Sequence, residues 1–165
     1  MTTSSHARRY VLVTLVLAAA AASPLVIAQG GRAMVRPGEV PWPSAIAGGT
    51  GTSGAAGIET VVLKGDPAKA GLYTLVLRVP PNIRIQPHSH RDDRVATVIK
   101  GTWYFAYGTR FDEAALKPLE PGSFYTEPPS QPHFAMTKDE VIIQVTGTGP
   151  SSTTYVDPAN DPTRR

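Results

Sequence analysis

The sequence has no cysteine, which excludes disulfide bonds and a lipid anchor attached to a cysteine after the apolar segment. It also has little excess charge, because 16 Lys and Arg stand against 13 Asp and Glu. We therefore expect no nucleic acid and no anionic membrane surface as partner. The longest apolar run, at residues 11–22, is shorter than the roughly 20 residues that a membrane span needs. No stable membrane anchor is expected.

Residues 1–28 have the order of regions typical of a secretory signal peptide. The basic pair Arg8 and Arg9 precedes the apolar run, and small residues follow it. We expect cleavage after Ala28, with cleavage after Ala22 as the alternative. Because Arg8 and Arg9 are the only charges in this segment, their removal from the 16 basic residues leaves 14 against 13 acidic ones. The mature chain is expected to be exported, to the periplasm or outside the cell.

Residues 29–57 are rich in Gly, Pro, Ala and Ser and show neither the period of a strand nor that of a helix. Such a segment buries too little apolar surface to offset its ordering entropy by itself. We predict a flexible arm or linker, and leave open whether Trp42 docks on the domain or the whole arm is disordered. Residues 58–165 then form one domain.

From Ile58 onward, short runs rich in Val, Ile, Thr, Tyr and Phe are separated by turn residues such as Gly, Pro, Asn and Asp, which is typical of β-strands. The runs lie at residues 58–67, 72–81, 82–90, 94–108, 123–129 and 140–150. The one helix candidate is a single turn that Asp112 would cap and Pro118 would stop. Strands at this spacing, without strand-helix alternation, predict an all-β sandwich or barrel.

Three of the four histidines fall in two clusters, a pair at the end of run 82–90 and a single one after run 123–129. His88 and His90 are two residues apart, so on a strand their side chains share one face, about 6 to 7 Å apart along the chain. His133 follows a turn and begins another run. Three imidazoles from neighbouring strands predict a divalent metal site, for which Fe, Zn, Cu, Ni and Mn are the candidates. A surface or packing role for the histidine pair is the alternative.

Two more pairs bear on the interior of the barrel. Trp103 and Phe105 alternate with Tyr104, so only one of these two sets faces inward. Tyr125 and Glu127 share a face of their own run and would line a pocket near the third histidine.

The spacing around the histidines resembles the two motifs of the cupin superfamily. The first motif, G-x5-H-x-H-x3,4-E-x6-G, matches in spacing at Asn82, His88, His90, Arg94 and Gly101. The second, G-x5-P-x-G-x2-H-x3-N, matches at Gly122, Pro128, Ser130, His133 and Thr137. The resemblance covers about residues 58–158 and implies a single double-stranded β-helix, the cupin or jelly-roll barrel, over residues 58–165.

Three departures from these motifs are mild. Asn82 replaces a glycine and tolerates the left-handed turn conformation. Ser130 and Thr137 replace the glycine and the asparagine of the second motif, at a turn and at a peripheral polar position.

Arg94 is the departure that bears on chemistry, because the family usually has a metal-binding glutamate there. An arginine stays protonated and cannot bind the ion. In one alternative, Arg94 turns outward or pairs with Asp92 or Asp93, and one of these acids or Glu127 is the fourth ligand. In the other, the site has three histidines only, and Arg94 clamps a substrate carboxylate.

The resemblance implies an exported cupin-domain protein that binds a divalent metal ion through His88, His90 and His133. We expect a small-molecule metalloenzyme of the dioxygenase, hydrolase or isomerase type, with Arg94 and Glu127 as candidate catalytic residues. The alternative is a non-catalytic module that binds a metal or a small ligand. The expected partner is a small-molecule ligand or substrate, and a homodimer is left open.

Overall fold

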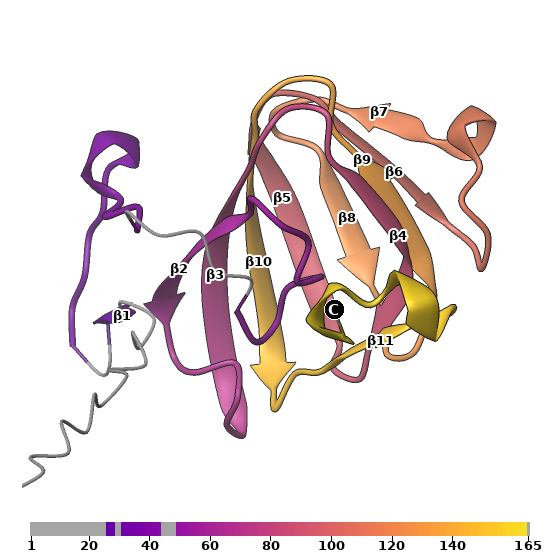
Figure 1. The fold of residues 1–165 in the computed structure, drawn as a ribbon. Coiled ribbons are helices and arrows are strands. Elements are labelled where there is room, and N and C mark those ends of the chain that lie inside the picture. Colours follow the sequence, from indigo (N-terminus) through magenta and orange to yellow (C-terminus); the bar gives the residue numbers. More distant parts are fainter. Residues whose placement is uncertain (1–25, 29–30, 44–48, 165) are drawn as a thin grey trace, which may run out of the picture.

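The computed structural model describes residues 26–28, 31–43 and 49–164. In these ranges two sheets pack face to face and enclose the core (Figure 1). The first sheet has the order β1 (Val26–Ala28), β2 (Glu59–Lys64), β3 (Gly71–Val79), β10 (Val141–Gly149), β5 (Arg94–Lys100) and β8 (Phe124–Glu127). The second has the order β11 (Thr153–Tyr155), β4 (Arg84–His90), β9 (His133–Met136), β6 (Trp103–Tyr107) and β7 (Lys117–Leu119).

The predicted all-β jelly-roll class is confirmed, because every predicted run contains a strand and the helical content is limited to single turns. These turns are η1 (Pro37–Glu39), η2 (Glu113–Ala115), η3 (Pro158–Asn160) and η4 (Pro162–Arg164). In η2, the Asp112 side chain accepts a hydrogen bond of 3.0 Å from the Ala114 backbone, which is the predicted cap. Among the described residues, no helix is long and apolar enough to cross a membrane.

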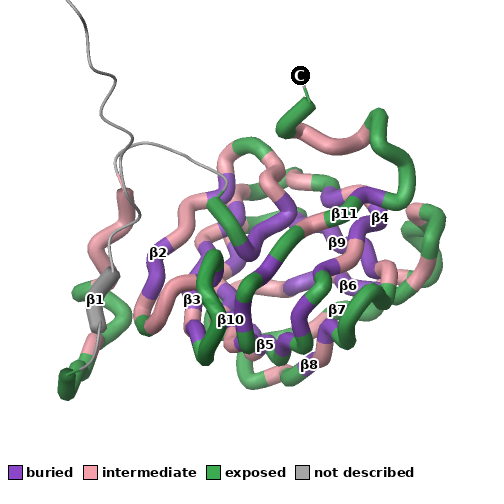
Figure 2. Tube along the Cα trace, turned by 90° about the horizontal axis from the view of Figure 1, so that it is seen from below, coloured by how far each residue is buried: buried purple, intermediate pink, exposed green. Residues whose placement is uncertain are grey.

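The core lies between the two sheets and follows the alternation of each strand. Figure 2 shows buried residues alternating with half-buried and exposed ones along the barrel strands. The alternation is clearest in β10, where every second residue from Val141 to Gly149 is buried. On β6, Trp103 and Phe105 are buried in the core, whereas Tyr104 is half-buried and Tyr107 is exposed. The inward set of this strand is therefore Trp103 and Phe105.

At one edge of the first sheet, β1 pairs in parallel with β2 and places Val26 opposite Val62. This strand lies at the end of the predicted signal peptide, of which residues 1–25 are outside the described ranges. Cleavage after Ala28 would remove β1, whereas cleavage after Ala22 would keep it.

The segment predicted as an arm contacts the barrel. The Arg78 guanidinium carbon on β3 lies 4.6 Å from the centre of the Trp42 ring, a cation–π contact. Docking through Trp42 is thus the alternative that the structure shows.

Candidate metal centre

Pairing of β4 with β9 brings the histidines together. His88 lies directly opposite His133, and a shift in register between Ile85 and His88 sets this pairing. His90 projects from the same face of β4 as His88. One ligand atom from each of the three histidines lies within 4.8 Å of the other two. The spacing of the sequence motif therefore becomes one cluster in the folded chain.

Each imidazole is held by a hydrogen bond from its Nδ1 atom to a backbone carbonyl. The bond from His88 to Gln86 is 2.9 Å, the bond from His90 to Ser152 is 3.2 Å, and the bond from His133 to Gln131 is 3.1 Å. Since a carbonyl only accepts, Nδ1 carries the proton in all three rings and Nε2 keeps its lone pair. Such outer contacts fix the rings of metal-binding histidines in the orientation that coordination needs.

Burial keeps these rings neutral. It lowers the pKa of His88 to about 3, and it also lowers the pKa values of His90 and His133. The Nε2 atom of His90 is buried and has no hydrogen-bond partner among the described residues. A buried lone pair without a partner, beside two further neutral imidazoles, fits a divalent metal ion.

Glu127 and Arg94 form a buried ion pair beside the histidines. They are directly opposite each other on β8 and β5, and only 5% and 3% of their surfaces are exposed. The Arg94 Nε atom donates a hydrogen bond of 2.8 Å to Glu127 Oε2, and Nη2 donates to the same oxygen. Burial alone would raise the pKa of Glu127, but the charge of Arg94 outweighs it and the pKa is lowered.

Of the three candidate acids, Glu127 is the one placed to serve as the fourth ligand. Its Oε2 atom lies 3.8 Å from His90 Nε2 and 3.7 Å from His133 Nε2. The Asp92 carboxylate is instead engaged by the Tyr73 hydroxyl at 2.5 Å, and Asp93 is exposed.

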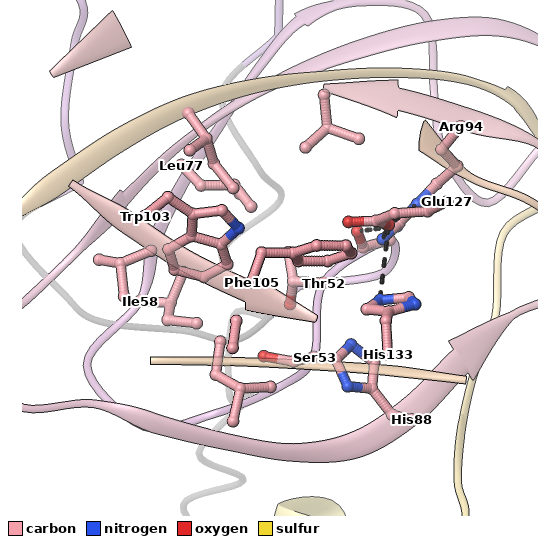
Figure 3. A pocket seen from close by; sticks show the side chains of 16 residues that line it. Thr52, Ser53, Ile58, Leu77, His88, Arg94, Trp103, Phe105, Glu127 and His133 are labelled. Atoms are coloured by element: carbon pink, nitrogen blue, oxygen red, sulfur yellow. Dashed lines mark hydrogen bonds and ion pairs between the residues drawn. The ribbon is translucent and has the colours of Figure 1, made fainter. Parts of the chain in front are cut away.

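Of the two alternatives for Arg94, the one in which it turns outward or pairs with Asp92 or Asp93 is wrong. Arg94 points inward, and its carboxylate partner is Glu127 (Figure 3). A cation at this position is compatible with a metal ion because the Glu127 carboxylate lies between Arg94 and the histidines.

Residues Gly51–Ser53, here called the strap, close the mouth of the barrel. Hydrogen bonds to its three backbone carbonyls hold the strap in place. The Gly51 carbonyl accepts a hydrogen bond of 2.6 Å from Arg94 Nη1. The carbonyls of Thr52 and Ser53 accept hydrogen bonds of 2.7 Å from the hydroxyls of Thr153 and Tyr155, respectively. Gly51 has a φ of 87°, a conformation that favours glycine. Nothing in the sequence indicates this contact, because any residue has a backbone carbonyl and a Gly-rich arm shows no residue pattern that predicts where it docks.

The strap separates an inner cavity from an outer cleft. The inner cavity measures about 30 Å³ and is lined by the strap, His88, His133 and Glu127 together with apolar side chains. The outer cleft measures about 340 Å³ and runs between the strap and the C-terminal segment that contains Thr153 and Tyr155. The three histidines are thus shielded from water on this side, in agreement with their burial.

The milder motif departures have physical roles. Asn82 and Ser130 both adopt the left-handed conformation, with φ of 60° and 59°, where the motifs have glycine. The Thr137 hydroxyl donates a hydrogen bond of 2.7 Å to the Pro80 carbonyl and accepts one of 3.0 Å from the Ile83 backbone N–H. It therefore ties β9 to the turn that leads into the histidine strand.

Comparison with known proteins yields matches among solved structures. No protein-family model matches the chain. No curated protein matches it. The polyketide cyclase RemF from Streptomyces resistomycificus is 18% identical, with 80% of this chain and 90% of that chain covered and a TM-score of 0.61. KdgF from Halomonas sp. is 18% identical, with 71% of this chain and 95% of that chain covered and a TM-score of 0.50.

Other matches cover less of the solved chain. An RmlC-like cupin from Shewanella frigidimarina is 20% identical over 63% of this chain and 82% of that chain, with a TM-score of 0.48. The chain spans 47% of a structure from a study of DMSP lyases and 30% of a salicylate 1,2-dioxygenase. Together with the two packed sheets, the likeness to RemF and KdgF shows that this chain has the cupin fold.

Proposed function

We propose that this protein is a metal-dependent enzyme acting on a small molecule, in which His88, His90, His133 and Glu127 hold one divalent ion. The observation that carries the proposal is the set of three buried imidazoles, each fixed through Nδ1 to a carbonyl, with ligand atoms that converge. A bound divalent ion supplies Lewis-acid chemistry, polarising a carbonyl or activating a water or dioxygen molecule.

The other groups of the site would support that chemistry. Arg94 holds the Glu127 carboxylate in place and keeps it ionised, because the pair is buried and charge-assisted. The strap excludes water from the inner cavity. Solved structures of this fold include a polyketide cyclase, which supports small-molecule chemistry as the proposed class.

The donor set suits Fe, Zn, Cu, Ni or Mn, since imidazole favours the first four and a carboxylate favours Mn. Elemental analysis of the purified protein tests the proposal. We expect one divalent ion per chain in the wild type and a large loss in His88→Ala and His133→Ala. The control is Tyr107→Phe, which removes an exposed hydroxyl bonded to Thr126. Absence of metal from the wild type, or full retention in His133→Ala, would contradict the proposal.

A non-catalytic module that stores a metal or a small ligand is the second candidate function. The small volume of the inner cavity, about 30 Å³, favours it, because that volume admits little beyond an ion and water. Turnover assays on the metal-loaded protein separate the two functions. Metal-dependent turnover that Glu127→Gln reduces supports the enzyme, whereas stable binding without turnover of any tested substrate supports the module.

We also infer that the chain is exported, from the order of basic, apolar and small residues in 1–28. Mass spectrometry of the protein from the periplasm or the medium tests this inference. A mature N-terminus at Gln29 or Ser23 is expected, and an intact N-terminus on protein that stays in the cytoplasm would contradict it.

A further inference from the structure

A row of four buried residues crosses the first sheet and ends beside the histidines. Gly147 on β10 lies opposite Tyr73 on β3 and, on its other side, opposite Arg94 on β5. Arg94 in turn lies opposite Glu127 on β8. All four residues are buried, and residues directly opposite each other on neighbouring strands project from the same face of a sheet. Tyr73 therefore lies at the far end of the row from Glu127.

Gly147 leaves room for a second buried carboxylate in this row. The Tyr73 hydroxyl donates a hydrogen bond of 2.5 Å to Asp92 Oδ2, and only 5% of the Asp92 surface is exposed. A Cβ atom on Gly147 would lie 2.6 Å from the Tyr73 hydroxyl and 2.9 Å from Asp92 Oδ2. The hydroxyl and the carboxylate therefore occupy the space that a side chain at position 147 would fill, between the strands of Tyr73 and Arg94.

The Asp92 carboxylate acts on Arg94 without touching it. Its second oxygen, Oδ1, is buried and has no hydrogen-bond partner among the described residues, so Arg94 does not bond to it. Burial alone would lower the pKa of Arg94, but the charge of Glu127 outweighs it and the pKa is raised. The charge of Asp92 raises the pKa of Arg94 as well. In a buried site of low dielectric, charges interact beyond direct contact.

We propose that Asp92, held by Tyr73 above Gly147, is the outer counter-charge of Arg94 and thereby sets the affinity of the metal centre for a divalent ion. This inference rests on the proposed function. Three neutral imidazoles and the paired Arg94 and Glu127 carry no net charge, so by themselves they attract a cation only weakly. Asp92 supplies the net negative charge of the buried site. Because it touches no bound ion, Asp92 is a positioning residue and not a ligand.

Two neighbouring substitutions test the role of the charge. Asp92→Asn removes the charge and keeps the shape of the side chain, and Asp93→Asn is the matched control because Asp93 is exposed. We expect Asp92→Asn to weaken zinc binding about tenfold and Asp93→Asn to bind zinc like the wild type, as measured by competition with a chromophoric chelator. The difference should persist in about 1 M salt, since buried charges are screened little. Equal zinc affinity of the two variants overturns the inference and leaves the metal centre standing.

The charge of the bound ion separates an electrostatic role of Asp92 from a structural one. Coulomb energy is proportional to the charge of the ion, so a tenfold loss for zinc(II) predicts a loss of about threefold for copper(I) in Asp92→Asn. A side chain that only supports the fold of the site would change the affinity for both ions alike. Equal losses for zinc(II) and copper(I) therefore overturn the inference.

Urea unfolding of the zinc-free protein tests the link between Asp92 and Arg94 without any ion. Asp92→Asn should lower the urea midpoint of the wild type more than that of Arg94→Met, in which the carboxylate has no cation to balance. If the wild type binds no zinc, the proposed function fails. Coupling in urea then still supports Asp92 as the counter-charge of Arg94, and absence of coupling overturns that as well. The comparison of Asp92→Asn with Asp93→Asn does not require Arg94→Met to fold.

Discussion

At the scale of single residues, Arg94 stands at the position of the glutamate in the cupin motif, and the nearest carboxylate to the histidines is that of Glu127. The two residues face each other across β5 and β8. The arginine therefore occupies the motif position, while its cross-strand neighbour carries the carboxylate toward His90 and His133. The positive charge lies behind this carboxylate, so the histidines meet a negative group first.

Glu127→Gln tests the role of this carboxylate. The amide is a weaker ligand and leaves Arg94 without its buried counter-charge, so zinc affinity should fall by about 10- to 100-fold or more. Competition with a chromophoric chelator measures the affinity. The matched control is Glu59→Gln, which breaks the ion pair with Arg78 on the first sheet away from the histidines. Equal affinity of Glu127→Gln and wild type would show that Glu127 is not a ligand.

The buried histidines predict how stability depends on pH in the metal-free protein. Burial lowers the pKa of His88 to about 3, and the unfolded chain has histidine pKa values near 6.5. Between pH 6.5 and 4.5 the unfolded state therefore binds protons that the folded state does not. The free energy of unfolding should fall as pH falls through this window, by up to about 1.4 kcal/mol per pH unit for each histidine.

Urea unfolding at a series of pH values measures this dependence. His88→Gln removes one of the titrating groups, so its slope should be shallower than that of the wild type by up to one proton. Identical slopes would mean that His88 titrates alike in both states, which its burial does not allow.

Replacing Ser130 by glycine is expected to raise the stability of the protein. Its φ of 59° is unfavourable for a residue with a Cβ atom. Ser130→Gly relieves this strain at some cost in unfolded-chain entropy, so the free energy of unfolding should rise by about 0.5 to 1 kcal/mol. Ser123→Gly is the control, because Ser123 has no positive φ and should lose stability. A lower free energy of unfolding in Ser130→Gly would contradict the inference that the backbone at Ser130 is strained.

At the scale of elements, the strap lies between the inner cavity with the histidines and the outer cleft, so it is expected to limit the exchange of a bound ion. Tyr155→Phe removes the hydroxyl that donates to the Ser53 carbonyl but keeps the ring that stacks on His88, with 5.3 Å between ring centres. Loss of one such bond should speed zinc removal by excess EDTA about fivefold. Stopped-flow chelation measures the rate, and Tyr107→Phe should match the wild type. An unchanged rate in Tyr155→Phe would exclude this route.

Some features of the elements could be predicted from the sequence and others could not. The strands and the shared face of His88 and His90 follow from residue types and spacing, because a strand has a fixed period. The approach of His133 was expected from the resemblance to the cupin motifs, and the register of β4 against β9 produces it. The partner of Arg94 does not follow from the sequence, because it depends on the register of β5 against β8. The docking of the strap could not be predicted either, because its contacts are made by backbone carbonyls, which every residue has.

At the scale of the whole molecule, the barrel surrounds one cavity with the histidines, the Arg94–Glu127 ion pair, apolar side chains and the strap. The cupin fold was predictable because both motifs keep their spacing over much of the chain. The sequence named Glu127 as one of three acids that could lie beside the histidines, but the choice among them needed the packed sheets, which bring Glu127 Oε2 to 3.8 Å from His90 Nε2 and 3.7 Å from His133 Nε2.

The coordination of a bound ion is the central claim, and X-ray absorption at the zinc edge of the loaded protein tests it most directly. We predict about three imidazole ligands, recognised by multiple scattering from the rings, and an oxygen ligand, with zinc–nitrogen distances of about 2.0 to 2.1 Å. His133→Ala should lose one imidazole from the shell. A shell of oxygen atoms without imidazole scattering would contradict the account.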